Sequence, residues 1–138
     1  MKTKDFFSKF YIQAIIVLFI FLLDRISKLI IINSDKNSLY NEIYSSKFLN
    51  IQLIWNEGIA FGLFSANEHN LYNLLTFLII SVILIILYML IKSEGLKKYA
   101  LLMIFSGAIG NVFDRITYRA VPDFIDFHVE NFHWFIFN

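Results

Sequence analysis

Residues 71–91 read LYNLLTFLIISVILIILYMLI and contain no charged side chain. A transmembrane helix needs about 20 predominantly apolar residues to cross a hydrocarbon core about 30 Å thick. This segment meets that requirement and predicts a membrane-spanning helix. It is the clearest candidate span in the chain, because the other apolar stretches contain or adjoin charged residues.

Two further apolar stretches lie on either side of this segment, at about residues 10–32 and 99–113. The first is interrupted by Asp24, Arg25 and Lys28, and the second is shorter than a full span. Together the three stretches predict an all-α integral membrane protein with three transmembrane helices in a single domain.

A cleaved signal peptide is the alternative reading of the first stretch, since lysines precede it. However, small residues in the spacing of a cleavage site do not follow the apolar run, and hydrophobicity resumes at residues 29–32. Its length therefore favours a retained span.

The composition agrees with a membrane protein. Hydrophobic residues make up 58% of the 138 residues and charged residues 17%, and mean hydropathy is +0.63. Soluble domains average about 45–50% apolar and about 25% charged residues. The net charge of +1 argues against a nucleic-acid partner. The lack of cysteine excludes disulfides and thiolate metal ligands.

The distribution of charge predicts how the chain crosses the membrane. The N-terminal tail and the link between the second and third spans share one side, which carries six bases and two acids. The loop at residues 33–70 and the tail at residues 114–138 carry four bases and eight acids. Because cytoplasmic segments are enriched in Lys and Arg, the N-terminus is predicted to be cytoplasmic, and the loop and tail face outward.

The outward loop contains a predicted strand. Residues 48–55, FLNIQLIW, partly alternate between apolar and polar side chains, as a half-buried β-strand does. The next residues, NEGIAFG at 56–62, contain two glycines that allow a turn or a close backbone approach. A small outward-facing region with β-structure is therefore expected.

Charged and small residues in the first and third spans suggest a helix contact. Asp24 and Lys28 stand at i and i+4 on one helix face, which favours a self-neutralising structural pair. Gly107, Ala108 and Gly110 are small residues of the kind that let membrane helices approach closely.

A group of polar residues follows these small ones. Asn111, Asp114 and Arg115 place an amide, a carboxylate and a guanidinium within about 1.2 helical turns. The residues alone leave two readings open, a functional site and a helix-packing motif whose charged end reaches the membrane surface.

The tail carries a second candidate site. Asp123 and Asp126 lie among apolar and aromatic residues, which disfavour the charged form of a carboxyl and suit a general acid or base. An interfacial aromatic anchor is the alternative. His128 and His133 are five residues apart, which is neither i,i+3 nor i,i+4, so no metal site is predicted. Serine-hydrolase motifs and phosphate-binding glycine loops are also lacking, which leaves carboxylate chemistry.

The chain resembles lipoprotein signal peptidase (signal peptidase II), the bacterial intramembrane aspartic peptidase family, over nearly its whole length. Five motifs carry the resemblance, in the family's order. They are Asp24 and Lys28; Asn56, Gly58, Ala60, Phe61 and Gly62; Gly110, Asn111, Asp114 and Arg115; Val121, Asp123 and Phe124; and Phe137 with Asn138.

The resemblance implies four spans, cytoplasmic termini and an active site near the outer face of the bacterial cytoplasmic (inner) membrane. It implies cleavage of diacylglyceryl-modified prolipoproteins before the lipidated cysteine, by two aspartates without a cofactor or metal. Membrane lipids are the other expected partner. The matching positions are Asp123 as a catalytic aspartate; Asn56, Gly58, Asn111, Asp114, Arg115 and Asn138 as substrate-binding or supporting residues; and Asp24 and Lys28 as structural residues.

The sequence departs from the family pattern at its end. The second catalytic aspartate and a fourth span are expected after Asn138, where the 138 residues stop, so a truncated chain is expected. Asp126 could replace that aspartate only if residues 123–126 were helical. Ser106 and Pro122 stand where the family usually has Gly and Val. An inactive fragment of the family and a small non-enzymatic membrane subunit remain alternatives.

Overall fold

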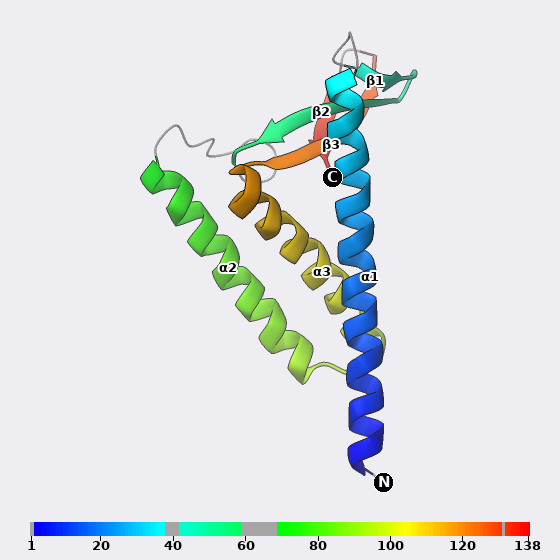
Figure 1. Cartoon of the computed structure of the whole chain (residues 1–138), viewed down its shortest axis with the longest axis vertical. Coiled ribbons are helices and arrows are strands. Elements are labelled where there is room, and N and C mark those ends of the chain that lie inside the picture. Colours follow the sequence, from blue (N-terminus) through cyan, green and yellow to red (C-terminus); the bar gives the residue numbers. More distant parts are fainter. Residues whose placement is uncertain (1, 38–41, 59–68, 131) are drawn as a thin grey trace.

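Three helices and four strands make up the structure, a computed structural model that describes residues 2–37, 42–58, 69–130 and 132–138. The elements in chain order are α1 (Lys2–Asn37), β1 (Glu42–Ser45), β2 (Leu49–Asn56), α2 (His69–Lys92), α3 (Gly95–Tyr118), β3 (Val121–Val129) and β4 (Phe132–Phe137). The sheet lies across the ends of α1 and α3 that are far from the N-terminus (Figure 1).

Helix α3 packs against both α1 and α2. A small cluster of buried leucines, Leu90, Leu101 and Leu102, joins α2 to α3 at the end remote from the sheet. Ile16 and Val17 of α1 pack on this cluster. At the end near the sheet α2 stands away from α1 (Figure 1).

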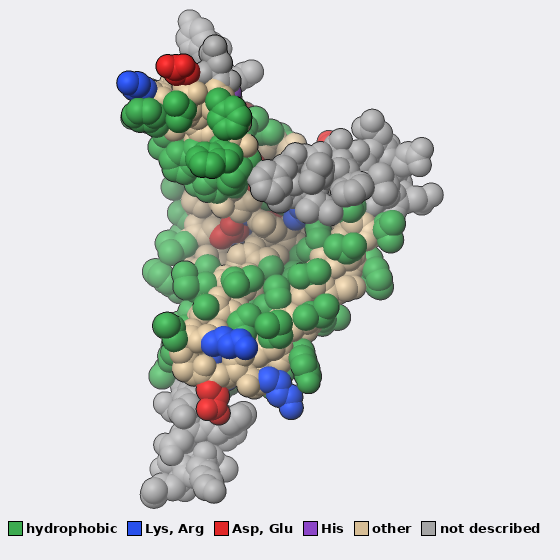
Figure 2. Space-filling model, turned by 180° about the vertical axis from the view of Figure 1, so that it is seen from behind, with side chains coloured by type: hydrophobic (Ala, Val, Ile, Leu, Met, Phe, Trp, Pro, Cys, Tyr) green, Lys and Arg blue, Asp and Glu red, His purple; other side chains and the backbone are tan. Residues whose placement is uncertain are grey.

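Most of the apolar side chains of the helices face outward. Phe77 of α2 is 68% exposed and Ile116 of α3 is 72% exposed, and α1 presents a similar surface from Phe10 onward. Figure 2 shows these apolar side chains covering the helices, with charged side chains gathered at the ends and in a recess below the sheet. A soluble monomer rarely exposes so large an apolar surface, whereas lipid accepts it.

Two helices in the described part of the chain are long and apolar enough to cross a membrane, at Asn73–Lys92 and Gly95–Tyr118. They correspond to the second and third expected spans, at residues 71–91 and 99–113. Helix α3 continues past residue 113, where the expected span ended, and stops at Arg119. Arg119 adopts a left-handed conformation (φ 59°), and its N–H donates to the carbonyl of Arg115 at 3.0 Å, a common way to end a helix.

The strands form one antiparallel sheet in the order β1-β2-β3-β4. Strand β2 confirms the strand expected at residues 48–55. The all-α expectation is wrong for the tail, because residues 121–137 form the hairpin β3–β4. Branched and aromatic residues such as Val121, Ile125 and Phe127 favour this extended structure. The fold is therefore three helices plus a four-stranded sheet.

An irregularity in β2 sets which side chains meet across the sheet. Ile51 pairs with Ile125 and Ile54 pairs with Asp123, so β2 has one residue more than β3 in this interval. Such a bulge reverses the alternation of side chains along one strand. The side chains of Gln52 and Asn56 consequently project from opposite faces of the sheet. Without the bulge, two residues four positions apart would project from the same face.

Candidate active site

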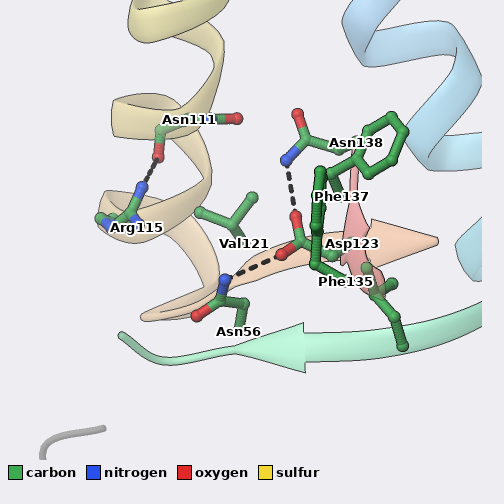
Figure 3. Close-up of a pocket in the computed structure, with 9 residues that line it drawn as sticks. Asn56, Asn111, Arg115, Val121, Asp123, Phe135, Phe137 and Asn138 are labelled. Atoms are coloured by element: carbon green, nitrogen blue, oxygen red, sulfur yellow. Dashed lines mark hydrogen bonds between the residues drawn. The ribbon is translucent and has the colours of Figure 1, made fainter. Parts of the chain in front are cut away.

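Asp123 lies on β3 at the wall of a pocket between the sheet and the helix ends (Figure 3). Its side chain is buried, at 5% exposure. Its two carboxylate oxygens accept hydrogen bonds from separate amides, Asn56 Nδ2 at 2.8 Å and Asn138 Nδ2 at 2.6 Å. The bonds come from neighbouring strand β2 and from the residue that follows β4, so the sheet register fixes the carboxylate from both sides.

The pocket has a volume of about 220 Å³ and combines polar and apolar walls. It brings together side chains that the sequence motifs place up to 82 residues apart. Its described lining residues are Asn56, Asn111, Arg115, Val121, Asp123, Phe135, Ile136, Phe137 and Asn138. Among them Asp123 is the only carboxylate.

Arg115 ties the end of β2 to α3. Its Nη2 donates to the carbonyl oxygen of Gly58 at 2.8 Å, and its Nη1 donates to the carbonyl oxygen of Asn111 at 3.2 Å. The N–H of Gly58 in turn donates to Asn56 Oδ1 at 2.9 Å. Because Asn56 accepts through its oxygen here, its NH₂ group is left to point at Asp123. Arg115 thereby orients the amide that holds Asp123.

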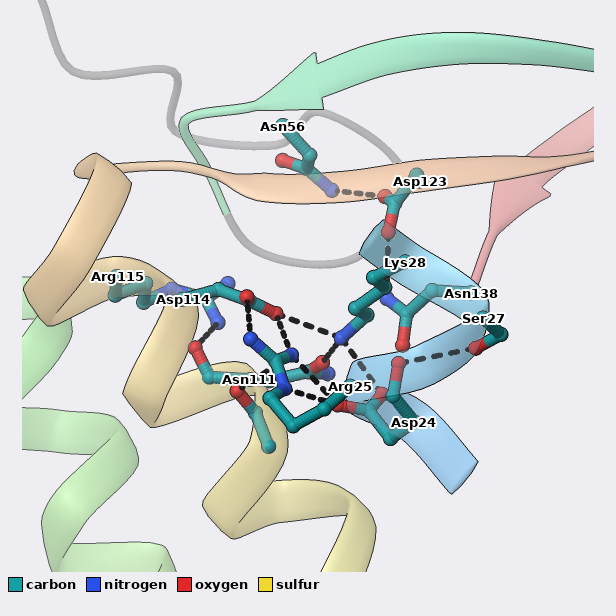
Figure 4. Close-up of polar contacts among 11 residues, drawn as sticks. Asp24, Arg25, Ser27, Lys28, Asn56, Asn111, Asp114, Arg115, Asp123 and Asn138 are labelled. Atoms are coloured by element: carbon teal, nitrogen blue, oxygen red, sulfur yellow. Dashed lines mark hydrogen bonds and ion pairs between the residues drawn. The ribbon is translucent and has the colours of Figure 1, made fainter. Parts of the chain in front are cut away.

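A group of buried charges lies between α1 and α3 below the pocket (Figure 4). Asp114 is fully buried and receives hydrogen bonds from Lys28 Nζ at 2.7 Å and from both terminal nitrogens of Arg25. Asp24 accepts from Arg25 Nη2 at 2.6 Å and lies 2.8 Å from Lys28 Nζ. Two cations face two anions, so the group is neutral as a whole, which is how charges persist at membrane depth.

This network includes the expected pair of Asp24 and Lys28, and it adds Arg25. Sequence reasoning gave Arg25 no role, and its only local signal was its position beside Asp24 within an apolar stretch. Lys28 Nζ also donates to Asn111 Oδ1 at 2.8 Å. Asn111 therefore touches both the charge network and the pocket.

At Gly110 the backbone of α3 lies very close to α1. A Cβ atom on Gly110 would lie 2.5 Å from Asp24 Oδ2, which is closer than real Cβ contacts allow. A Cβ on Gly107 would meet nothing within 4 Å. The expectation that Gly107 contributes to the close approach is therefore wrong. Ser106 is fully buried, and its hydroxyl donates to the Leu102 carbonyl oxygen in its own helix.

Asp126 lies on the other face of β3. Residues 123–126 form a strand and not a helix, so side chains three apart point to opposite faces. Asp126 is fully buried and lies within hydrogen-bond distance of Gln52 Nε2 (3.2 Å) and His133 Nδ1 (2.9 Å). The structure thus removes the condition under which Asp126 could pair with Asp123.

Of the other residues singled out in the sequence, some are not described, and Pro122 is not among the described residues that line the pocket. Ala60, Phe61 and Gly62 lie outside the described residues. Pro122 is buried and pairs in register with Trp55, directly before Asp123 on β3.

Comparison with known proteins identifies the family. The family model described as Peptidase_A8, signal peptidase (SPase) II, matches residues 16–138. The chain belongs to the signal peptidase II family. The enzyme class expected from the motifs, an aspartic peptidase of the signal peptidase II type, is thereby confirmed.

Individual relatives agree with this assignment. A lipoprotein signal peptidase of Pelagibacter ubique is 46% identical over 131 residues, which cover 95% of this chain and 79% of the relative. That of Anaplasma phagocytophilum is 37% identical, covering 92% of this chain and 81% of the relative. A solved bacterial membrane enzyme structure superposes with a TM-score of 0.66 and 26% identity, covering 91% of this chain and 80% of that one.

Proposed function

We propose that Asp123 is a catalytic carboxylate of this signal peptidase and that its substrates are diacylglyceryl-modified prolipoproteins. The observation that carries the proposal is the environment of Asp123, a buried carboxylate held by two amide donors at the wall of a pocket. Buried carboxyls placed by hydrogen bonds are suited to general acid–base catalysis. The family membership supplies the reaction class.

The reaction needs a second carboxyl next to Asp123. Two close carboxyls share one proton, so the charged one can accept a proton from water while the neutral one donates toward the scissile carbonyl. The family pattern places the second aspartate three residues after Asn138. Asn138 itself lies beside Asp123, with its amide nitrogen 2.6 Å from the carboxylate.

The other pocket residues have supporting roles in this proposal. Asn56 and Asn138 orient the Asp123 carboxylate, and Arg115 with Gly58 orients Asn56. Phe135 and Phe137 provide apolar wall against which a lipid-bearing substrate packs. Asp24, Lys28 and Asp114 belong to the charge network that joins α1 to α3 and so have a structural role.

The proposed site lies near the outer face of the bacterial cytoplasmic membrane. Helix α1 acts as a third span, since its side chains from Phe10 to Ile30 expose an apolar surface like that of α2. Lys92 is the last residue of α2, and Lys97 and Lys98 lie in the first turn of α3. These ends of α2 and α3 lie toward the same end of the molecule as the N-terminus (Figure 1). The positive-inside rule makes that end cytoplasmic, which puts the sheet and Asp123 outside.

Cleavage of a diacylglyceryl prolipoprotein in lipid, by protein whose chain extends through the second aspartate, tests the proposal. Asp123→Asn keeps the shape of the side chain and removes the carboxyl, so cleavage should fall by orders of magnitude. Glu130→Gln is the control, since it removes an exposed charge from the same hairpin and should cleave normally. Normal cleavage by Asp123→Asn would contradict the proposal.

A further inference from the structure

Three side chains that can bind a metal ion gather on one face of the β3–β4 hairpin. Asp126 and His128 are two residues apart on β3, so both project from the same face. His133 on β4 is the register partner of His128 and therefore projects beside it. This face is opposite the one that carries Asp123, so the cluster lies outside the proposed catalytic pocket.

The ligand atoms of the cluster are already close together. His133 Nδ1 lies 2.9 Å from Asp126 Oδ2 and 3.1 Å from Oδ1. The imidazole rings of His128 and His133 are stacked, with centroids 5.1 Å apart and an angle of 22° between planes. Each of the three residues offers an atom within 4.8 Å of the others. Ligands of one tetrahedral zinc ion lie about 3.3 Å apart, so metal binding requires side-chain rotations that bring these atoms closer together.

The charge balance of the cluster calls for a cation. Asp126 is fully buried, and its described hydrogen-bond partners are Gln52 and His133. Asp114 is equally buried but lies against Arg25 and Lys28. Among its described partners only His133 can carry a positive charge, and only in its protonated form. A buried carboxylate is costly unless a positive charge compensates it. A metal ion bound to Asp126 would supply that charge.

An unpartnered nitrogen points to the same conclusion. His128 Nδ1 is the one buried side-chain nitrogen or oxygen without a hydrogen-bond partner among the described residues. Buried polar atoms are nearly always partnered, so a buried nitrogen without a partner needs an explanation, and a bound ion is one. A ring nitrogen with a free lone pair is a metal ligand in the neutral tautomer of histidine.

We propose that Asp126, His128 and His133 bind a divalent transition-metal ion, with Zn²⁺ the best match. Two imidazoles and one carboxylate are ligands that zinc accepts, whereas Ca²⁺ and Mg²⁺ prefer oxygen ligands throughout. His133 is half exposed, which leaves a fourth position open to water. The bound ion cross-links β3 to β4, the strand that leads to Asn138.

Zinc binding to the chelator-treated protein in detergent micelles tests this proposal. Isothermal titration with Zn²⁺ should give one saturable site per chain. His128→Ala and His133→Ala should each weaken it at least about tenfold, because each removes a ligand. His69→Ala is the matched control, since His69 is the third histidine of the chain and lies on α2. Asp123→Asn should bind zinc like the wild type, which separates this site from the peptidase proposal.

Two measurements guard against variants that fail to fold. Zn²⁺ should raise the melting temperature of the wild-type protein and of His69→Ala, but not of His128→Ala or His133→Ala. X-ray absorption at the zinc edge of the loaded wild type should show two imidazole ligands and an oxygen ligand. Absence of saturable binding overturns the proposal, as does binding that His128→Ala and His133→Ala leave intact. A spectrum without imidazole ligands overturns it in the same way.

Discussion

Gly110 on α3 lies so close to Asp24 on α1 that a single Cβ atom would come within 2.5 Å of the Asp24 carboxylate. This contact locates the charge network at the crossing of the two helices. Asp24 holds Arg25 and Lys28, and these cations reach across to Asp114 on α3. A glycine at this position therefore decides whether the two halves of the network can meet.

Gly110→Ala should destabilise the protein by about 1–3 kcal/mol, the usual cost of forcing an extra group into a packed site. The methyl group must displace Asp24, which also contacts both cations of the network. Gly107→Ala is the matched control three residues earlier in the same helix, where a Cβ meets nothing within 4 Å. It should be neutral or slightly stabilising, because alanine favours helix. Equal stability of the two variants in thermal unfolding would contradict the packing argument.

Lys28→Met should be more damaging, at about 3–5 kcal/mol, because removal of one partner leaves buried charge uncompensated. Lys28 is 1% exposed and its amine contacts Asp24, Asp114 and Asn111. Adding Asp114→Asn to this variant should restore part of the stability, since Asp24 and Arg25 then balance each other. Unfolding of the single and double variants measures the coupling. Additive effects of the two substitutions would contradict the neutral-network interpretation.

The sequence predicted the helices well and the sheet only in part. The span at residues 71–91 follows from composition alone, because an uncharged apolar run of about 20 residues is long enough to cross the membrane as a helix. The hairpin β3–β4 was missed because its polar residues do not alternate strictly. The side chains of Asp123 and Asp126 project from opposite faces of the sheet. The alternation of apolar and polar residues that marks a half-buried strand is therefore broken. The bulge in β2 blurs the pattern there in the same way.

The site shows a similar division. Asn111, Arg115 and Asp123 were candidates from the residues alone, and Asn56 and Asn138 came from the resemblance. All five line one pocket. Arg25 was missed because its role depends on Asp114, 89 residues later in the chain. His128 and His133 were judged by helical spacing, whereas a hairpin places residues five apart directly opposite each other. Contacts that depend on tertiary structure leave little trace in local spacing.

Arg115→Lys should reduce prolipoprotein cleavage by about tenfold to a hundredfold, the equivalent of one hydrogen bond from a charged group. The two terminal nitrogens of Arg115 donate to the carbonyl oxygens of Gly58 and Asn111. The single ammonium group of lysine cannot reproduce this pair of hydrogen bonds. Without it Gly58 loses its tie to α3, and the Asn56 amide that holds Asp123 loses its fixed orientation.

The kinetic signature of Arg115→Lys separates positioning from substrate binding. If Arg115 acts through Asn56, kcat should fall and KM should change little, because the defect lies in the placement of Asp123. Arg119→Lys is the control, since it makes the same replacement at an exposed position at the end of α3. It should cleave at the wild-type rate. A rise in KM alone for Arg115→Lys would instead mean that its guanidinium contacts the substrate directly.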